Sequence, residues 1–211
     1  MTTAQNNSDQ ITVTLPDGST RAIAAGSTGM DVANGIAKSL AKKALVARVN
    51  GELWDLDRPL EGDAELAIIT RDDDDALEII RHDCAHVMAQ AVQELFPGTQ
   101  VTIGPVIENG FFYDFHREES FAPEDFEAIE KRMAEIIKQD KPFTRHVYDR
   151  KDAIKFFKDK GEEFKVELIE DLPEDQTITL YDQGDWIDLC RGPHAPSTGK
   201  VGNHFKLMKM T

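Results

Sequence analysis

A run of four aspartates, Asp72–Asp75, most constrains how this chain can fold. Adjacent carboxylates repel one another and lose hydration when they are buried, so the run has to lie in solvent. It divides the 211 residues into a shorter amino-terminal part and a longer remainder. We therefore expect two folding units joined by an exposed linker. We interpret the run as a solvated helix start, capped by Asp75, rather than as a metal site.

The part before this run predicts a compact mixed unit over residues 10–71. The pattern indicates, in order, a strand at 11–15, a turn at 16–19, a strand at 20–23, a helix capped by Thr28 with Val32, Ile36 and Leu40 on one face, and strands at 45–49 and 66–70. Asn50-Gly51 is a strong hairpin signal, because both residues tolerate positive φ. This order predicts a ubiquitin-like β-grasp domain, preceded by a disordered tail at 1–9.

The part after the run predicts a larger α+β domain over residues 76–211, which makes the whole chain an α+β protein. We expect a long helix from Ala76 to Phe96, short strands between 101 and 115, a helix from about 123 that carries Phe126, Ile129, Met133 and Ile136, a helix at 152–160, and strands at 177–181 and 186–189. Pro97-Gly98 ends the first helix, and Gly161 ends the third.

Charge and composition narrow the classes of partner. The net charge of −15 argues against a broad nucleic-acid surface, because phosphates would be repelled. Residues 189–211 nevertheless contain no acid, and they hold the weak candidates for RNA contact: Arg191, Lys200, Lys206 and Lys209. No apolar run approaches the roughly 18 residues of a membrane span. Two cysteines and a start without secretory features predict a reducing cytoplasm.

The long helix carries two histidines on an unusual face. His82 and His86 are one turn apart on a side that also holds Gln90 and Gln93 and is polar but almost uncharged. A freely solvated helix face normally carries Lys and Glu. This strip therefore favours the lining of a wet cleft, although ordinary surface histidines remain an alternative.

Cys190 and His194 follow more than a hundred residues later, on either side of the turn at Gly192-Pro193. With His82 and His86 they make three imidazoles and one thiol, which is a plausible zinc set. The same groups can also work without metal. A histidine can act as general base while a lysine, for which Lys165 is a candidate, stabilises negative charge. The pattern of residues leaves both readings open.

Three motifs carry a family resemblance. They are Leu77-Glu-Ile-Ile-Arg-His-Asp-Cys-Ala-His86, Ile103-Gly-Pro-Val-Ile-Glu-Asn-Gly-Phe-Phe-Tyr-Asp114 and Asp188-Leu-Cys-Arg-Gly-Pro-His194. Together they resemble the editing domain of bacterial-type threonyl-tRNA synthetases. The first unit, with Leu15-Pro-Asp-Gly18 and Arg48-Val-Asn-Gly-Glu52, is similar to the TGS module of that family. The resemblance covers nearly the whole chain.

This resemblance implies proofreading hydrolysis of tRNA(Thr) mischarged with serine. It implies that His82 and Lys165, with His86, activate or position the attacking water. It also implies that Tyr113, Asp188, Cys190 and His194 hold the substrate. Editing in this family is expected to need no metal, so we expect no zinc at this site; any zinc bound would have His82, His86, Cys190 and His194 as ligands.

The resemblance also assigns ATP and a separate zinc ion to an aminoacylation core that this sequence lacks, and it implies a parent homodimer formed through that core. The sequence leaves two alternatives open. One is a zinc-dependent deacylase of the alanyl-tRNA editing type, which would not explain the leading β-grasp unit. The other is a non-catalytic RNA-binding module.

Overall fold

The computed structural model describes residues 10–209, so the predicted tail at 1–9 lies outside the described residues. The chain forms two compact units. The first contains the residues up to Leu77 together with Pro193–Pro196, and the second contains Glu78–Gly192 and the residues from Ser197 onward. Helices and strands occur in both, which confirms the α+β class. Within residues 10–209, no helix is long and apolar enough to cross a membrane.

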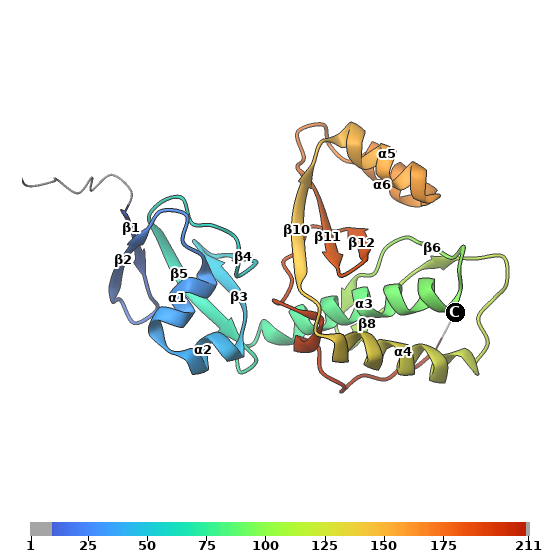
Figure 1. The fold of residues 1–211 in the computed structure, drawn as a ribbon, viewed down its shortest axis with the longest axis horizontal. Coiled ribbons are helices and arrows are strands. Elements are labelled where there is room, and N and C mark those ends of the chain that lie inside the picture. Colours follow the sequence, from blue (N-terminus) through green and yellow to red (C-terminus); the bar gives the residue numbers. More distant parts are fainter. Residues whose placement is uncertain (1–9, 210–211) are drawn as a thin grey trace, which may run out of the picture. The chain divides into compact units, whose positions relative to one another are not determined.

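The first unit is a five-stranded sheet with two short helices (Figure 1). Its elements are β1 (Gln10–Thr14), β2 (Thr20–Ala24), α1 (Gly29–Ile36), α2 (Lys38–Lys43), β3 (Ala44–Val49), β4 (Glu52–Trp54) and β5 (Ala64–Thr70). The strand order is β2-β1-β5-β3-β4, in which β1 and β5 are parallel and the other pairs antiparallel. The predicted β-grasp order of a hairpin, a helix and further strands is therefore confirmed.

One helix of this unit differs from its prediction. Thr28 caps α1 through a capping box with Asp31, as the sequence suggests. The helix ends at Ile36, however, because Ala37 is extended and a second short helix carries Leu40. Gly35 in the last turn is a poor helix former, which is consistent with the break. The core of the unit includes Val13, Val32, Ala47, Val49 and Leu66.

The acidic run lies at the end of this unit. Asp72, Asp73 and Asp74 are exposed, as expected for a solvated segment. Asp73 accepts hydrogen bonds from the main-chain N–H and the hydroxyl of Thr70, and Asp75 forms an ion pair with Arg48. The charges of the run are therefore stabilised by solvent and by contacts with neighbouring residues.

The hairpin between β3 and β4 shows the predicted backbone. Asn50 has φ 48° and Gly51 has φ 89°. A residue with a Cβ resists this left-handed region, and only glycine enters it without steric cost. Open space surrounds the position where a Cβ on Gly51 would lie. Backbone conformation alone therefore sets the penalty for replacing this glycine.

We predict that Gly51→Ala lowers the free energy of unfolding of the first unit by about 1–2 kcal/mol, because alanine resists the left-handed region. Gly62→Ala is the matched control, since Gly62 also has open space around a built Cβ but lacks a positive φ. The control is expected to leave stability unchanged or slightly raised. Urea denaturation followed by circular dichroism measures both, and equal effects would contradict the prediction.

The second unit contains the remaining elements. They are α3 (Ala76–Leu95), β6 (Gln100–Val101), β7 (Val106–Ile107), β8 (Gly110–Phe111), β9 (Phe115–His116), α4 (Asp125–Gln139), β10 (Phe143–Tyr148), α5 (Arg150–Lys160), α6 (Glu163–Asp171), β11 (Ile178–Gln183), β12 (Trp186–Leu189) and the 3-10 turn η2 (Thr198–Lys200). The strands β10, β11 and β12 form an antiparallel sheet, and β6–β9 and β7–β8 form two small ladders.

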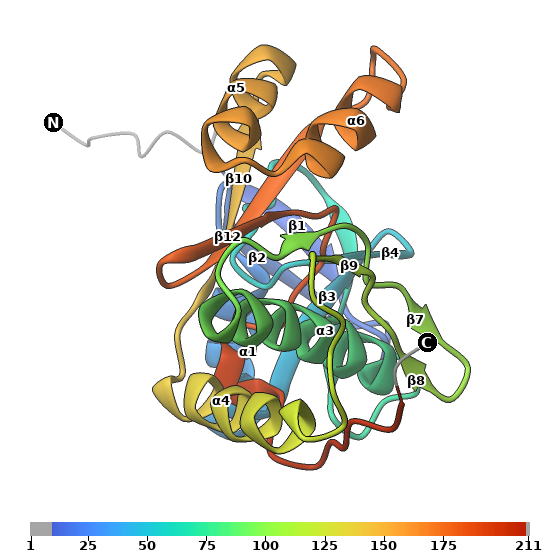
Figure 2. The ribbon, with the colours of Figure 1, turned by 90° about the vertical axis from the view of Figure 1, so that its right-hand side faces the viewer.

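Helix α3 is the centre of this unit. One side of it packs against α4, where Cys84, Val87 and Ala91 meet Ile129 and Met133. Another side packs against the strands, where Ala89 contacts Val101 and Trp186. Figures 1 and 2 show α4 beside α3, and α5 and α6 at the far end of β10 and β11. The helix is thus covered on two sides, and its polar strip faces the interior of the unit.

The sequence analysis missed strand β10 and helix α6 of the second unit. Strand β10 is an edge strand whose middle residues are only half-buried, so its apolar pattern is weak. Helix α6 buries Lys165 together with Val166 and Ile169. A lysine within the buried stripe interrupts the apolar periodicity from which an amphipathic helix is recognised. Lys165 is buried at this position because it forms an ion pair with Asp188.

Candidate functional site

A pocket of about 510 Å³ lies within the second unit. Its lining comes from α3, the segment before β7, α6 and the end of β12. The lining residues are His82, His86, Thr102, Ile103, Gly104, Pro105, Tyr113, Lys165, Leu168, Leu172, Gln176, Thr177, Ile178, Thr179, Asp188, Leu189, Cys190 and Arg191. A volume of this size suits a small organic ligand or the end of a larger one. Six of the residues assigned to the site from the sequence line this one pocket.

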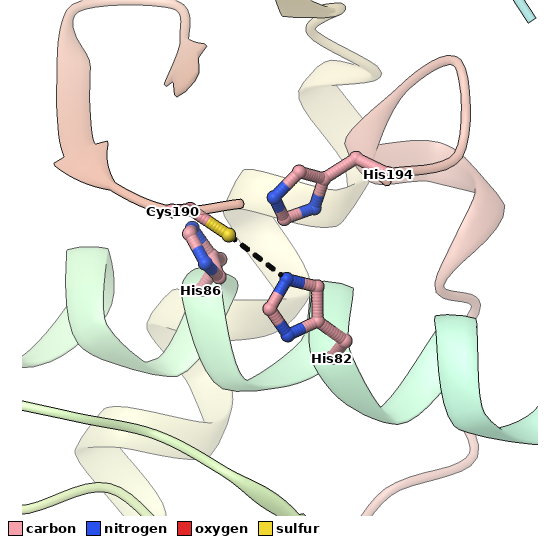
Figure 3. A group of neighbouring side chains, drawn as sticks. All are labelled: His82, His86, Cys190 and His194. Atoms are coloured by element: carbon pink, nitrogen blue, oxygen red, sulfur yellow. Dashed lines mark hydrogen bonds between the residues drawn. The ribbon is translucent and has the colours of Figure 1, made fainter. Parts of the chain in front are cut away.

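The two histidines of α3 approach the thiol that follows β12 (Figure 3). The Nε2 atom of His82 lies 3.1 Å from Sγ of Cys190. The rings of His82 and His86 lie edge to face, with centroids 4.9 Å apart. His86 also contacts the rings of Phe143 and Trp186 edge to face. Packed rings hold His86 in place, and His82 contacts the thiol.

Burial sets the protonation of this pair. It lowers the pKa of His82, and the carboxylates of Asp83 and Asp188 oppose the shift without reversing it. Burial also raises the pKa of the Cys190 thiol to about 12. At neutral pH the imidazole is therefore neutral and the thiol protonated. We assign the contact as an S–H donor to the Nε2 lone pair, which places the imidazole proton on Nδ1.

A buried ion pair forms another wall of the pocket. Nζ of Lys165 lies 2.7 Å from Oδ1 of Asp188, and the two side chains are 3% and 2% exposed. The Tyr113 hydroxyl donates to Oδ2 of Asp188 at 2.7 Å. Burial alone would raise the pKa of Asp188, but the Lys165 ammonium, helped by His86, more than offsets it and the pKa is lowered. The carboxylate is therefore ionised and pairs with Lys165 in a site with little water.

The turn after Cys190 depends on Gly192. Its φ of 69° lies in the left-handed region, and its main-chain N–H donates to the Cys190 Sγ at 3.2 Å. A Cβ at this position would lie 2.1 Å from the hydroxyl oxygen of Tyr181. The N–H of Cys190 in turn donates to the carbonyl of Thr179 at 3.1 Å. Cys190 is thus held by two main-chain contacts, one to its thiol and one from its own N–H.

His194 belongs to the segment Pro193–Pro196, which groups with the first unit, and its main-chain N–H donates to Oδ1 of Asp55 at 2.9 Å. One ligand atom each from His82, His86, Cys190 and His194 lies within 4.8 Å of the others. Tetrahedral zinc sets its donors roughly 3.5 Å apart, given bonds of about 2.0–2.3 Å. The four donors therefore match zinc in their chemical kind, with loss of the thiol proton on binding.

The basic residues of the last segment have separate surroundings. Arg191 is exposed at the pocket and contacts the Gln176 amide, and Lys206 forms an ion pair with Glu130 at 2.7 Å. Lys209 is exposed and Lys200 is half-buried in η2. RNA contact at these four positions stays a prediction.

The sequence analysis also missed residues that support the site. It grouped Gln90 and Gln93 with the histidines as the lining of a wet cleft, but their side chains bind neighbouring elements instead. The Gln90 Oε1 accepts from the Gln183 amide at 2.7 Å, and the Gln93 Oε1 accepts from the Trp186 indole at 2.7 Å. The uncharged character of the strip was a usable signal, because an uncharged polar face also suits buried hydrogen bonds.

Comparison with known families gives the class. Residues 11–70 match the TGS domain, and residues 178–211 match the second additional domain of threonyl and alanyl tRNA synthetases. A β-grasp domain is thus followed by an α+β domain of the synthetase editing type, with its histidines, thiol and lysine gathered in one pocket.

The relatives that the chain matches are threonine–tRNA ligases. The chain is 66% identical over 200 residues to a threonine–tRNA ligase of Maricaulis maris, covering 95% of this chain and 31% of the relative. It is 62% identical over 202 residues to that of Rhodopseudomonas palustris, covering 96% and 31%. Over nearly all of its length it therefore matches the amino-terminal region of threonine–tRNA ligases, which confirms the recognition made from the motifs. The chain spans about a third of the length of these relatives.

We predict that Asp188→Asn lowers the free energy of unfolding of the second unit by about 3–5 kcal/mol, because it leaves the Lys165 ammonium buried and unpaired. Asp159→Asn is the control, since it removes a carboxylate from an exposed pair with Lys155 and should leave the unfolding midpoint unchanged. Denaturant unfolding of both variants tests this. A midpoint for Asp188→Asn equal to that of the control would show that the buried pair contributes nothing.

Proposed function

We propose that this chain hydrolyses the ester bond of tRNA(Thr) mischarged with serine. One observation carries the proposal: a neutral imidazole and a buried ammonium, from His82 and Lys165, line one pocket. The similarity to threonine–tRNA ligases and the editing-type domain supply the substrate class. Proofreading is a chemical need here, because one missing methyl discriminates by only about 1–3 kcal/mol in a binding pocket.

The residues divide the reaction between them. A water molecule replaces the Cys190 thiol as the hydrogen-bond donor to Nε2 of His82. His82 accepts a proton from this water on Nε2, and the water oxygen bonds to the ester carbonyl carbon. The Lys165 ammonium stabilises the negative charge that develops on the carbonyl oxygen. The carbonyl re-forms as the bond to the ribose oxygen breaks, and that oxygen takes the proton from His82. Serine and a tRNA with a free ribose hydroxyl are released.

The other lining residues hold the substrate. Asp188 carries a negative charge beside Lys165, so it suits recognition of the seryl ammonium, and the Tyr113 hydroxyl keeps it oriented. His86 and Cys190, which line the same pocket, then bound the space available to the amino-acid side chain. The proposed pocket admits serine and excludes threonine through its extra methyl, as the second sieve of an editing enzyme requires.

The proposal extends to the surroundings of the chain. We assign aminoacylation, with its ATP and its own zinc, to the part of a threonine–tRNA ligase that this chain does not cover. We assign the formation of a homodimer to the same part. The partner is tRNA(Thr). Both cysteines are free thiols, and we propose a reducing cytoplasm as the compartment.

A zinc-dependent deacylase is the second candidate, and the four clustered donors favour it. In that case His82, His86, Cys190 and His194 would hold the ion, which would supply Lewis-acid chemistry when bound. We prefer metal-free hydrolysis, because the Lys165 ammonium already supplies positive charge in the pocket. Metal-free action is thus part of the proposal.

We predict that the chain, in excess, hydrolyses seryl-tRNA(Thr) at least about 100-fold faster than threonyl-tRNA(Thr), because the methyl is excluded sterically. A chelator is expected to leave the rate unchanged. Single-turnover deacylation with and without the chelator measures both properties. Chelator-sensitive loss of serine would establish the zinc enzyme instead, and failure to hydrolyse either ester would refute the proposal.

His82→Ala and Lys165→Ala are the variants that test the assigned roles. Each is expected to lower the single-turnover rate by about 100-fold or more, since a general base and an electrostatic stabiliser each contribute on that scale. Lys158→Ala, an exposed lysine of α5, is the matched control. Thermal unfolding of each variant separates lost chemistry from lost folding.

We predict that the hydrolysis rate declines with acid only below pH 6.5. Because burial lowers the pKa of His82 from 6.5, the imidazole is protonated only at a lower pH than an ordinary histidine, and that protonation removes the base. A single-turnover pH–rate profile locates this limb. A limb above pH 6.5 would place the base on a group whose pKa is raised and would exclude His82.

A further inference from the structure

Glu162 occupies a position next to the site where several elements meet. It precedes the first residue of α6, yet its carboxylate makes no capping bond to that helix. The carboxylate instead accepts from the side-chain amide of Gln93 and, at 3.2 Å, from the main-chain N–H of Val101. The Glu162 side chain is 9% exposed and, within the described chain, it lies outside the lining of the pocket.

Gln93 extends this contact to a third element. Its amide nitrogen donates both to Glu162 and to the carbonyl of Thr99 at 2.9 Å. Its amide oxygen accepts from the indole N–H of Trp186 at 2.7 Å. The donors and the acceptor of Gln93 are thus all engaged, and Glu162 is connected through it to the first residue of β12.

Each connected element carries a residue of the pocket. Gln93 lies two turns after His86 on α3, on the same face. Trp186 lies two residues before Asp188 in β12, and both are buried on one face of the strand. Val101 leads into the pocket segment that begins at Thr102. The carbonyl of Glu162 accepts from the N–H of Lys165 at 3.1 Å and so fixes the first turn of α6.

We propose that Glu162 is a positioning residue for ester hydrolysis. It sets the Lys165 ammonium in register with His82 and Asp188 by joining α6, α3, β6 and β12 through its carboxylate and Gln93. This role rests on the proposed function of the pocket. Glu162 reaches the reacting atoms only through the residues it holds, so it is distinct from the catalytic groups.

The carboxylate is the group that fits this role. Both neighbours, the Gln93 amide and the Val101 N–H, are donors, and an ionised carboxylate offers acceptors only. A glutamine at position 162 has nearly the same shape, but its NH₂ group would face one of those two donors. The resulting shift of α6 is small, yet displacements of about 1 Å at a distance from the chemistry lower rates by about 100-fold.

The test compares Glu162→Gln with Glu163→Gln in the 211-residue chain. Glu163 is the adjacent residue and is exposed. Its main-chain N–H, which the substitution keeps, donates to the Gln100 side chain. Glu162→Gln is expected to lower the saturating single-turnover rate with seryl-tRNA(Thr) by about 10- to 100-fold, with a half-saturating concentration within about twofold of the parent. Glu163→Gln is expected to retain the parent rate.

Rescue separates positioning from general destabilisation. Gln93→Glu alone sets two carboxylates against each other and should also be slow. The double variant Glu162→Gln with Gln93→Glu restores a donor–acceptor pair and keeps an acceptor for Trp186, but it loses the donor to the Thr99 carbonyl, so it should be faster than Gln93→Glu and recover part of the parent rate. Trp186→Phe keeps an aromatic ring and removes the N–H donor. It remains informative if Glu162→Gln does not fold, and we expect it to lower the rate about fivefold.

The outcomes distinguish this inference from the proposed function. NMR reports on the network without reference to activity. We expect faster exchange of the Val101 amide hydrogen and a shifted Trp186 indole signal in Glu162→Gln, and neither change in Glu163→Gln. If the parent chain hydrolyses the ester and Glu162→Gln matches Glu163→Gln, the positioning role is overturned and the function stands. If the double variant is no faster than the slower single variant, the role is also overturned. A parent chain without activity refutes the proposed function and the catalytic part of this inference together, while the NMR signals still report the network.

Discussion

The buried ion pair between Lys165 and Asp188 is the constraint on which the second unit depends. Two charges that are 3% and 2% exposed are tolerable only if they stay paired and hydrogen-bonded. Asp188 meets this condition through Lys165 and the Tyr113 hydroxyl, and α6 and β12 must therefore remain in fixed register. A buried pair is a poor source of stability compared with apolar packing, so its presence points to chemistry at this position.

Helix α3 supplies the frame around that pair. Its apolar residues pack against α4, while its polar strip provides His82 and His86 to the pocket and Gln90 and Gln93 to the strands. The same face thus serves binding and support. Because the glutamine amides are uncharged, they can be buried with their hydrogen bonds satisfied, where lysine or glutamate would require a counter-charge.

The sequence predicted most of the first unit and the clustering of the site residues. Local signals carry the first unit: positive φ at Asn50 and Gly51, and the capping box at Thr28, are set by neighbours in the chain. The site was predicted from motif order, because spacing alone left zinc and metal-free readings open. Helix α6 and Glu162 were missed, since their burial depends on partners far along the chain. A lysine reads as a surface residue until its distant aspartate is known.

The electrostatics of the pocket explain how a base and an ammonium can coexist there. Burial lowers the pKa of His82 against the opposing charges of Asp83 and Asp188, and Asp188 is also the partner of the Lys165 ammonium. Burial keeps the Cys190 thiol protonated as well, so the lone pair of Nε2 faces a neutral neighbour. The pocket therefore keeps its proton acceptor uncharged and its positive charge paired, which is the separation that hydrolysis of a neutral ester at neutral pH requires.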